Sequence, residues 1–304
     1  KETGETFNGF LTQKSTGSKT LVYNSDKGEL TTINRNDYTV VMNAEGRREN
    51  VVVVPVTSSE VLLSEVVSRR IAETIIDASN KGPQAIIVQI DNPGGRGDYM
   101  KIISSAISQT DNCPVLAYIS GEQYGGAFSA AALIAQACDR IFISSTASIG
   151  AMGPYTGPTV SDEEFEDYMS TYCSDALASY SIYATALAEE HNRPPLLVRA
   201  LIDKRLSVVE VETIQQTRTF VQKDERQPTQ TRIRTLAEGI ESDAALASLP
   251  QGQLVGAVLN LPPTTAVDVG LVDEVVGSLN DVLVAMDYGD VKLTNASGVE
   301  KSIK

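Results

Sequence analysis

The rhythm of apolar and polar positions changes near residue 50, and this change divides the chain into two parts. Residues 1–49 contain short runs in which apolar and polar side chains alternate, separated by turn sequences such as STGS, SDKG and NRN. Alternation at this spacing predicts a small antiparallel β meander or barrel. Because nothing in this segment carries chemistry, we expect a cap in preference to a docking or assembly module.

From Val51 onward, continuous apolar runs alternate with helical sequence. The runs are VVVVPV, AIIVQID, PVLAYIS and DRIFISS. This alternation is typical of right-handed βαβ units, so it predicts an α/β core built on a mostly parallel sheet. Active sites of such sheets lie at the carboxyl ends of the strands.

A serine stands where the third apolar run passes into a helix. PVLAYIS leads through a turn with Gly125 and Gly126 to the small-residue sequence SAAALIAQAC, which starts at Ser129. A hydroxyl group at this point faces the free N–H groups and the positive dipole end of the helix. We therefore predict that Ser129 is the nucleophile of an acyl transfer.

The preceding strand ends in a similar turn, with the sequence NPGG. Its glycines let backbone N–H groups approach a ligand closely. We expect the N–H groups of Gly95 and Ala130 to form an oxyanion hole. We expect Gly94, Gly125 and Gly126 to line the substrate site. Each turn alone is also compatible with an ordinary βα connection, but the two together are more specific.

The order of these pieces is similar to that of a known family. A strand, DNPGG, a helix, a strand, GGAFSAA, a helix and DRIFISSTASIGAMGP follow one another. This order resembles the signal peptide peptidase A family and its relatives, the nodulation-efficiency-D-type serine peptidases. The match extends roughly from Val51 to Met286 and is most specific at Asp91–Gly95, Ser129–Ala135 and Ser148–Gly150.

The resemblance implies a Clp protease/crotonase-like fold and a serine peptidase that hydrolyses peptides or membrane-protein fragments. Ser129 would be the nucleophile, with Gly95 and Ala130 as the oxyanion donors. Relatives assemble into multimers, so the resemblance also implies a homo-oligomer. It implies an extracytoplasmic or periplasmic location, with membrane association through a segment outside this chain.

The chain departs from the family pattern at the position of the general base. These peptidases use a lysine roughly forty to fifty residues after the serine. Here no lysine lies between Lys101 and Lys204, and the expected place reads STYCSD. Three groups could substitute: Lys101, Lys204, each from its own or a neighbouring subunit, and His191, the only histidine. All three are interpreted more simply as surface charges near helix ends or on helix faces.

Three functions therefore remain open. The first is a serine peptidase with an unidentified base. The second is a catalytically inactive homologue that binds peptides or serves assembly. The third is acyl-CoA chemistry on the crotonase version of the fold, against which the Ser-Ile-Gly match speaks.

The composition argues against several classes of binding partner. The 304 residues carry a net charge of −14 and no basic stripe, which argues against nucleic acid. No apolar run approaches the roughly 20 residues that span a bilayer, so we expect a soluble chain. It begins at Lys1, which suggests that a targeting segment preceded it. Metal-binding spacing is absent, and we expect neither a metal nor a cofactor.

We expect two domains: an SH3-like β module at 1–49 and a Clp/crotonase-like peptidase domain at 50–304. Between about 207 and 256 the strand and helix order is lost in polar sequence. This stretch predicts an insertion with two β-like pieces and a helix.

The chain has three cysteines. Cys113 and Cys138 precede consecutive strands that should lie about 4.8 Å apart, which is compatible with a disulfide. Two buried thiols are equally compatible, and Cys173 stays unassigned in either case.

Overall fold

The fold was analysed in a computed structural model. It describes residues 9–11, 19–24, 28–34, 48–152, 173–203, 206–237, 259–288, 292–295 and 300–301.

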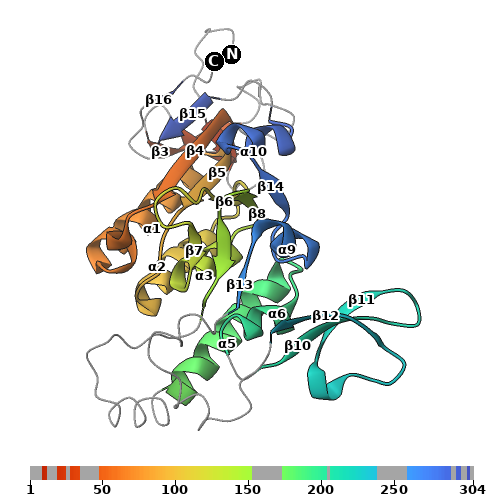
Figure 1. The fold of residues 1–304 in the computed structure, drawn as a ribbon. Helices are drawn as coiled ribbons and strands as arrows, with labels where there is room; N and C mark the ends of the chain where they lie inside the picture. The colour runs from red at the N-terminus through yellow and green to blue at the C-terminus, as the bar shows by residue number, and fades with distance from the viewer. Residues whose placement is uncertain are drawn as a thin grey trace, which may run out of the picture.

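A seven-stranded sheet forms the centre of the described structure (Figure 1). Its strands, in spatial order, are β14 (Glu274–Val276), β8 (Arg140–Ser144), β6 (Val115–Ile119), β5 (Pro83–Ile90), β4 (Arg48–Val56), β15 (Lys292–Asn295) and β16 (Glu300–Lys301). Every neighbouring pair from β14 to β15 is parallel, and only β16 runs antiparallel to its neighbour. The four apolar runs therefore form parallel strands, as predicted.

Helices connect and cover these strands. They are η2 (Ser59–Leu62), α1 (Glu65–Asn80), α2 (Gly97–Ser108), α3 (Ala130–Gln136), α5 (Cys173–Glu190), α6 (Pro195–Ala200), α9 (Pro263–Asp268) and α10 (Leu279–Ala285). The order β4-α1-β5-α2-β6 is the βαβ arrangement that the alternation predicts. The α/β fold class is confirmed.

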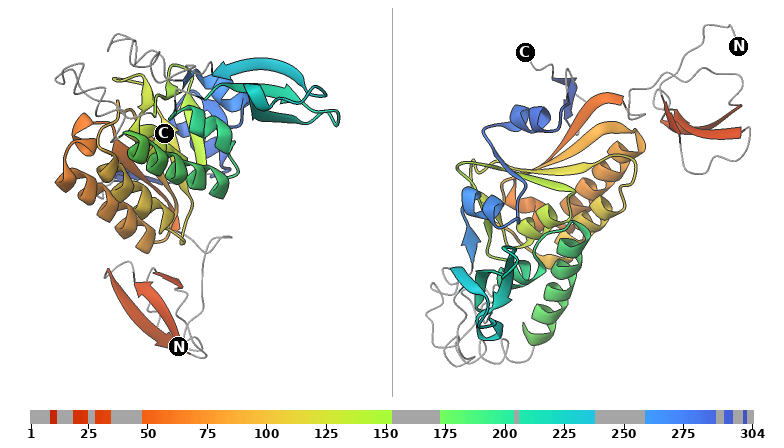
Figure 2. Two further views of the ribbon diagram at one scale, coloured as in Figure 1. Left: turned by 90° about the horizontal axis from the view of Figure 1, so that it is seen from below. Right: turned by 90° about the vertical axis from the view of Figure 1, so that its right-hand side faces the viewer.

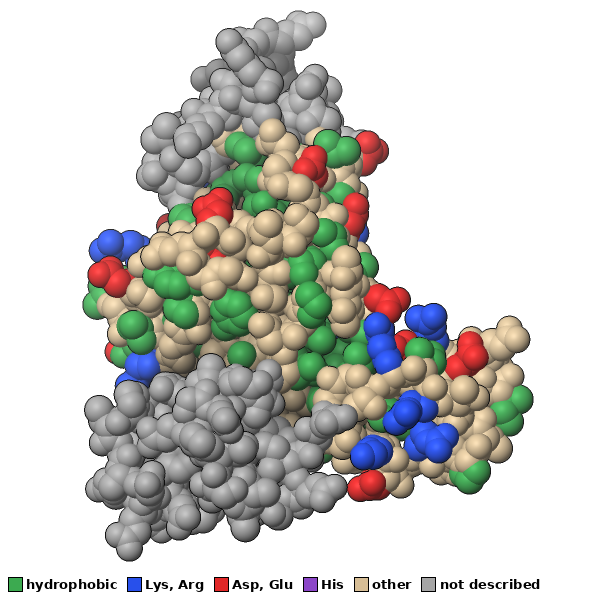
Figure 3. Space-filling model, viewed as in Figure 1, with side chains coloured by type: hydrophobic (Ala, Val, Ile, Leu, Met, Phe, Trp, Pro, Cys, Tyr) green, Lys and Arg blue, Asp and Glu red, His purple; other side chains and the backbone are tan. Residues whose placement is uncertain are grey.

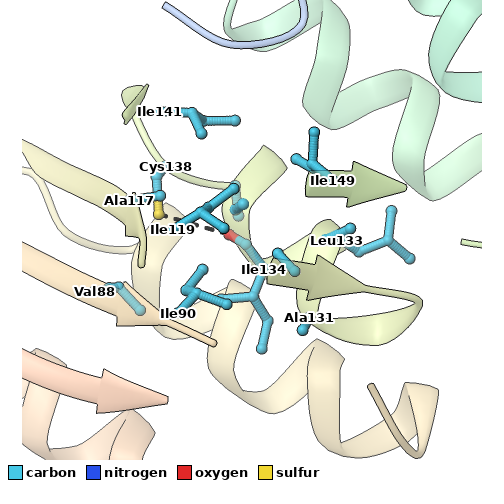
Figure 4. Packing of buried hydrophobic residues seen from close by; sticks show 14 of the residues in the cluster. Val88, Ile90, Ala117, Ile119, Ala131, Leu133, Ile134, Cys138, Ile141 and Ile149 are labelled. Carbon is cyan, nitrogen blue, oxygen red and sulfur yellow. Dashed lines mark hydrogen bonds between the residues drawn. The ribbon is translucent and has the colours of Figure 1, made fainter. Parts of the chain in front are cut away.

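Successive residues along the sheet pack into two different apolar clusters because side chains alternate between its faces. Val52 and Ile86 belong to the larger cluster, together with residues of α1, α2 and α3. Val51 and Ile87 belong to the smaller cluster, which includes residues of α10. Figure 4 shows part of the larger cluster around Ile134 of α3.

A second, three-stranded sheet lies next to the carboxyl ends of the parallel strands. Its order is β13 (Asn260–Leu261), β9 (Ser148–Gly150) and β7 (Gly126–Phe128). β7 pairs parallel with β9, and an isolated bridge joins Asn92 to Ala127. These strands are too short to give a clear apolar pattern, so they were not predicted from the sequence.

The N-terminal segment contains an antiparallel meander of β1 (Gly9–Leu11), β2 (Lys19–Asn24) and β3 (Glu29–Asn34). The predicted antiparallel pairing is confirmed for these residues. An SH3-like barrel is not confirmed, and the proposed domain boundary stays a prediction.

The polar insertion differs from its prediction. It forms three antiparallel strands, in the order β11 (Arg218–Gln222), β10 (Val208–Glu212) and β12 (Thr231–Ala237), with a short 3₁₀ turn η4 (Lys223–Glu225). Two β-like pieces and a helix were expected between about 207 and 256; three strands are present up to Ala237, and residues 238–258 lie outside the described residues. We call residues 206–237 the arm. It extends away from the parallel sheet (Figures 1 and 2).

Candidate active site

Ser129 occupies a strained turn between a strand and a helix. It follows β7 directly and precedes the first residue of α3, with φ 54° and ψ −125°. Its own N–H donates to Gly150 O at 3.0 Å, which ties the turn to β9. A side chain at this φ costs about 1–3 kcal/mol and persists where the surroundings enforce it. The predicted position of Ser129 at the mouth of a strand-to-helix turn is confirmed.

Gly94 lies against Ser129. A methyl group added at Gly94 would sit 2.6 Å from Ser129 Cβ, 2.8 Å from Phe128 O and 3.2 Å from Ser129 Oγ. Gly94 also has φ +100°, which side chains rarely adopt. The two glycine-containing turns that the sequence singled out are therefore brought together.

The two predicted oxyanion donors begin or precede helices beside this contact. Gly95 is exposed, and Ala130 is the first residue of α3. Among the described residues, neither N–H group has a hydrogen-bond acceptor. Their assignment as an oxyanion hole stays a prediction, which this availability supports.

Asp91 and Asn92 hold the two turns in place, and sequence reasoning gave them no role. The buried carboxylate of Asp91 accepts hydrogen bonds from the N–H groups of Gln123, Tyr124 at 3.0 Å and Gly126 at 3.0 Å. Asn92 Oδ1 accepts from Gly94 N at 2.9 Å, and Asn92 Nδ2 donates to Ser58 O at 2.8 Å. A polar pair directly after a buried apolar strand was the signal that could have identified them.

Gly125 and Gly126 have a structural reason for being glycine. Their φ values are 81° and 146°, and a methyl group on Gly126 would sit 2.0 Å from Ser148 O. Ser148 N donates to Gly125 O at 2.9 Å. These contacts hold the turn before β7 against Ser148 of β9. The proposed substrate contacts of the two glycines stay predictions.

His191 lies at the wrong end of α3 to serve Ser129. It follows α5, and its imidazole lies beside the backbone of Ala137. Since Ser129 begins the helix and Ala137 ends it, the two positions are separated by roughly 12 Å along the axis. Burial, and then the charge of Arg193, lower the pKa of His191. It is half-buried, so the description as a surface histidine needs correction.

Lys101 is not the solvated charge that was expected. Its ammonium lies over the rings of Tyr180 at 5.6 Å and Tyr183 at 5.5 Å, which both belong to α5. Tyr183 Oη is also 2.6 Å from Ser104 Oγ on the same helix as Lys101. Lys204, and the expected lysine position through Tyr172, lie outside the described residues.

The structure does not join Cys113 to Cys138. Both are buried, and Cys138 Sγ instead points toward Ile134 O, at 3.6 Å, within the last turn of α3 (Figure 4). Burial raises the pKa of the Cys138 thiol, so it stays protonated. Of the two arrangements that the sequence left open, a disulfide and two buried thiols, the structure has the two buried thiols.

Within the described ranges, no group of three or more His, Cys, Asp and Glu side chains is arranged to hold a metal ion. No helix in that part of the chain combines the length and apolarity needed to cross a bilayer.

A parallel sheet, a strained serine turn at its carboxyl edge and the adjoining Gly-Gly turn define the Clp protease/crotonase-like class. Within that class, the chain belongs to the NfeD1b N-terminal domain family, which matches residues 50–230.

Individual relatives agree with this placement. The membrane-bound protease PH1510 of Pyrococcus horikoshii is 30% identical over 138 residues. The aligned part is 45% of this chain and spans only 30% of that protein.

Among solved structures, a 1510-N membrane-bound stomatin-specific protease, in a lysine-to-alanine variant with a substrate peptide, is 20% identical, with a TM-score of 0.49. The match covers 84% of this chain and 87% of that one. A probable enoyl-CoA hydratase/isomerase from Mycobacterium abscessus is 12% identical, with a TM-score of 0.40 and coverage of 79% and 71%.

Proposed function

We propose that this chain is a serine peptidase of the signal peptide peptidase A-like class, with Ser129 as its nucleophile. The observation that carries the proposal is the strained backbone of Ser129, held at φ 54° directly against Gly94. Strain of this kind clusters at catalytic turns, where it exposes a nucleophile at the end of a strand. Homology to a membrane-bound protease supports the same function.

In the proposed reaction, Ser129 Oγ attacks the carbonyl carbon of a peptide bond and loses its proton to a base. The negative charge that develops on the carbonyl oxygen is stabilised by the N–H groups of Gly95 and Ala130. Collapse of the tetrahedral intermediate expels the amine, which takes up the proton, and water then hydrolyses the acyl-enzyme. The group that accepts the Ser129 proton is not assigned.

The proposed substrate is an extended peptide or a membrane-protein fragment. A relative that was solved with a substrate peptide supports this class of ligand. We further propose that the chain works as a homo-oligomer in an extracytoplasmic or periplasmic location, in association with a membrane. The description of the Pyrococcus horikoshii relative as membrane-bound supports that association.

One observation favours a second function. No lysine lies between Lys101 and Lys204, so the usual base of this class is absent from its place. In this alternative the chain is an inactive homologue that binds peptides or serves assembly, and the turn around Ser129 is an inherited framework.

A fluorophosphonate probe with intact-mass readout separates the two functions. The probe should add once to the wild type and to Ser148→Ala, a matched control on neighbouring β9, but not to Ser129→Ala. The pH at which labelling is half complete would then report the apparent pKa of the activating base. A folded wild type that takes no probe at any pH would overturn the peptidase and leave the binding function.

A further inference from the structure

The turn that follows β5 consists of residues 93–96, and most of its backbone N–H groups are already used. Pro93 has no N–H group to donate. The N–H of Gly94 donates to Asn92 Oδ1 at 2.9 Å, and the N–H of Arg96 donates to a carbonyl of η2 at 2.8 Å. Among the described residues, the N–H of Gly95 has no acceptor. Gly95 therefore carries the N–H group of this turn that is available to a ligand.

Asn92 is held by both its backbone and its side chain. Its N–H donates to Gly126 O at 2.8 Å and its carbonyl accepts from Phe128 N at 3.1 Å, so its backbone pairs with β7. Its Nδ2 donates to Ser58 O at 2.8 Å. The residue is fully buried, and its polar side-chain atoms are satisfied within the protein. Because β7 leads directly into Ser129, Asn92 connects the Gly-Gly turn to the nucleophile.

The helical turn η2 lies against the other side of Gly95. A methyl group added at Gly95 would sit 2.3 Å from Leu62 O. The two bonds to this region come from Asn92 Nδ2, which donates to Ser58 O, and from Arg96 N, which donates to Leu62 O. Because the peptide units before and after it are both held, the N–H of Gly95 points in a defined direction.

Charged side chains do not take over the task of this N–H group. Arg96 follows Gly95 directly, but its guanidinium pairs with Asp98 at 2.8 Å and lies over the ring of Tyr99 at 4.9 Å. Figure 3 shows the described Lys and Arg side chains on the arm and at the margin near α1 and α2, and none over β7 and α3 in that view. A negative charge that develops beside Ser129 would therefore depend on backbone N–H groups.

We propose that Asn92 is a positioning residue for the reaction at Ser129. By accepting the N–H of Gly94, it leaves the N–H of Gly95 as the donor that the Gly-Gly turn offers to the oxyanion. It also holds Gly94 in the φ +100° conformation that brings this turn against Ser129. This role rests on the proposed peptidase function, and Asn92 acts through Gly95 without touching the substrate.

Hydrogen exchange tests the geometry without any catalysis. In a sample with isotope-labelled glycine, NMR should show the N–H of Gly94 exchanging about 10-fold more slowly than that of Gly95, relative to an unfolded chain, because it makes one more hydrogen bond. Asn92→Leu keeps a similar shape without the oxygen and should abolish this difference. Asn92→Ser should retain part of it, because a serine hydroxyl makes the same bond to the N–H two residues later, but more weakly.

Labelling with a fluorophosphonate tests the catalytic consequence. The dependence of the rate on probe concentration separates probe binding from the maximal rate of reaction at Ser129. Asn92→Leu should lower the maximal rate by on the order of 100-fold with little change in probe binding, because a donor displaced by about 1 Å stabilises the transition state less. Asn92→Ser should recover part of the rate. A purely structural residue would lower the urea midpoint without changing this rate per folded molecule.

Leu283→Ala is the matched control for a loss of stability. Leu283 is a buried residue of α10 in the smaller apolar cluster, on the other face of the sheet. Its truncation should lower the urea midpoint and leave both the exchange pattern and the labelling rate unchanged.

Two results would overturn the role of Asn92: equal exchange of Gly94 and Gly95 in the wild type, or labelling of Asn92→Leu at the wild-type rate. A wild type that shows the expected exchange pattern but takes no probe would overturn the peptidase function itself. The exchange measurement thus distinguishes the two failures.

Discussion

Gly94 and Ser129 touch: a methyl group on Gly94 would lie 2.6 Å from Ser129 Cβ and 3.2 Å from its hydroxyl oxygen. Asn92 holds Gly94 in this position, since Asn92 Oδ1 accepts a hydrogen bond from the N–H of Gly94 at 2.9 Å. The backbone of Gly94 therefore lies next to the Ser129 hydroxyl, with no side chain between them.

Gly94→Ala should destabilise the protein by about 2–3 kcal/mol, because the new methyl group meets Phe128 O and the backbone has φ +100°. Urea unfolding measures the loss. Gly125→Ala is the matched control: it has φ +81° but no atom within 4 Å of the added carbon, so only about 1 kcal/mol is expected. Equal losses would show that the close contact is absent.

Ser129→Gly should be more stable than Ser129→Ala, by about 1 kcal/mol. Both variants lack the hydroxyl, but only glycine adopts φ 54° without strain. Ala130→Gly, one position later at the start of α3, should behave in the opposite way and lower stability by up to about 1 kcal/mol. Thermal and urea unfolding of the three variants provide the comparison, and a less stable Ser129→Gly would contradict the strained turn.

Arg193→Lys should cost about 2–4 kcal/mol. The guanidinium is 5% exposed and donates to Gln136 O and Cys138 O, both at 2.6 Å, at the carboxyl end of the helix that Ser129 begins. A lysine cannot reproduce this planar pair of donors, so a helix-end carbonyl loses its partner. Arg199→Lys, at an exposed position of α6, should change stability by less than about 0.5 kcal/mol. A similar effect at both positions would refute the capping role.

His191 allows a test by pH, because it is the only histidine. Burial lowers its pKa below the ordinary value of about 6.5. As pH falls, the unfolded chain therefore binds the proton first. This contribution to stability is complete above about pH 6.5 and is lost as pH falls toward the folded-state pKa.

NMR titration of the single imidazole should give a pKa below about 6.5. His191→Gln should reduce the fall in the urea midpoint between neutral and mildly acidic pH, since glutamine does not titrate. A measured pKa at or above the ordinary value would contradict the burial of the ring.

The parallel core was predictable because its strands are buried on both faces. VVVVPV, AIIVQID, PVLAYIS and DRIFISS are continuous apolar runs, and such runs form central parallel strands with little ambiguity. The position of Ser129 could be predicted for a related reason: a strand, a glycine turn and a small-residue helix specify a strand-to-helix turn locally. The three arm strands were harder to predict from the sequence, because a charged residue, Glu210, lies in the middle of β10. Its burial is possible only because Arg234 of β12 and Arg218 of β11 pair with it.

The sequence by itself determined the α/β class, the strand order along the chain and the serine at the mouth of α3, because these depend on local periodicity and turn chemistry. Only the tertiary structure decided that Gly94 lies against Ser129, that Asp91 holds the Gly125 and Gly126 turn, and that Arg193 caps α3. Each of these contacts joins residues separated by many positions. Such contacts form only when the sheet is assembled, because burial then forces each polar group to find a partner wherever the fold brings one.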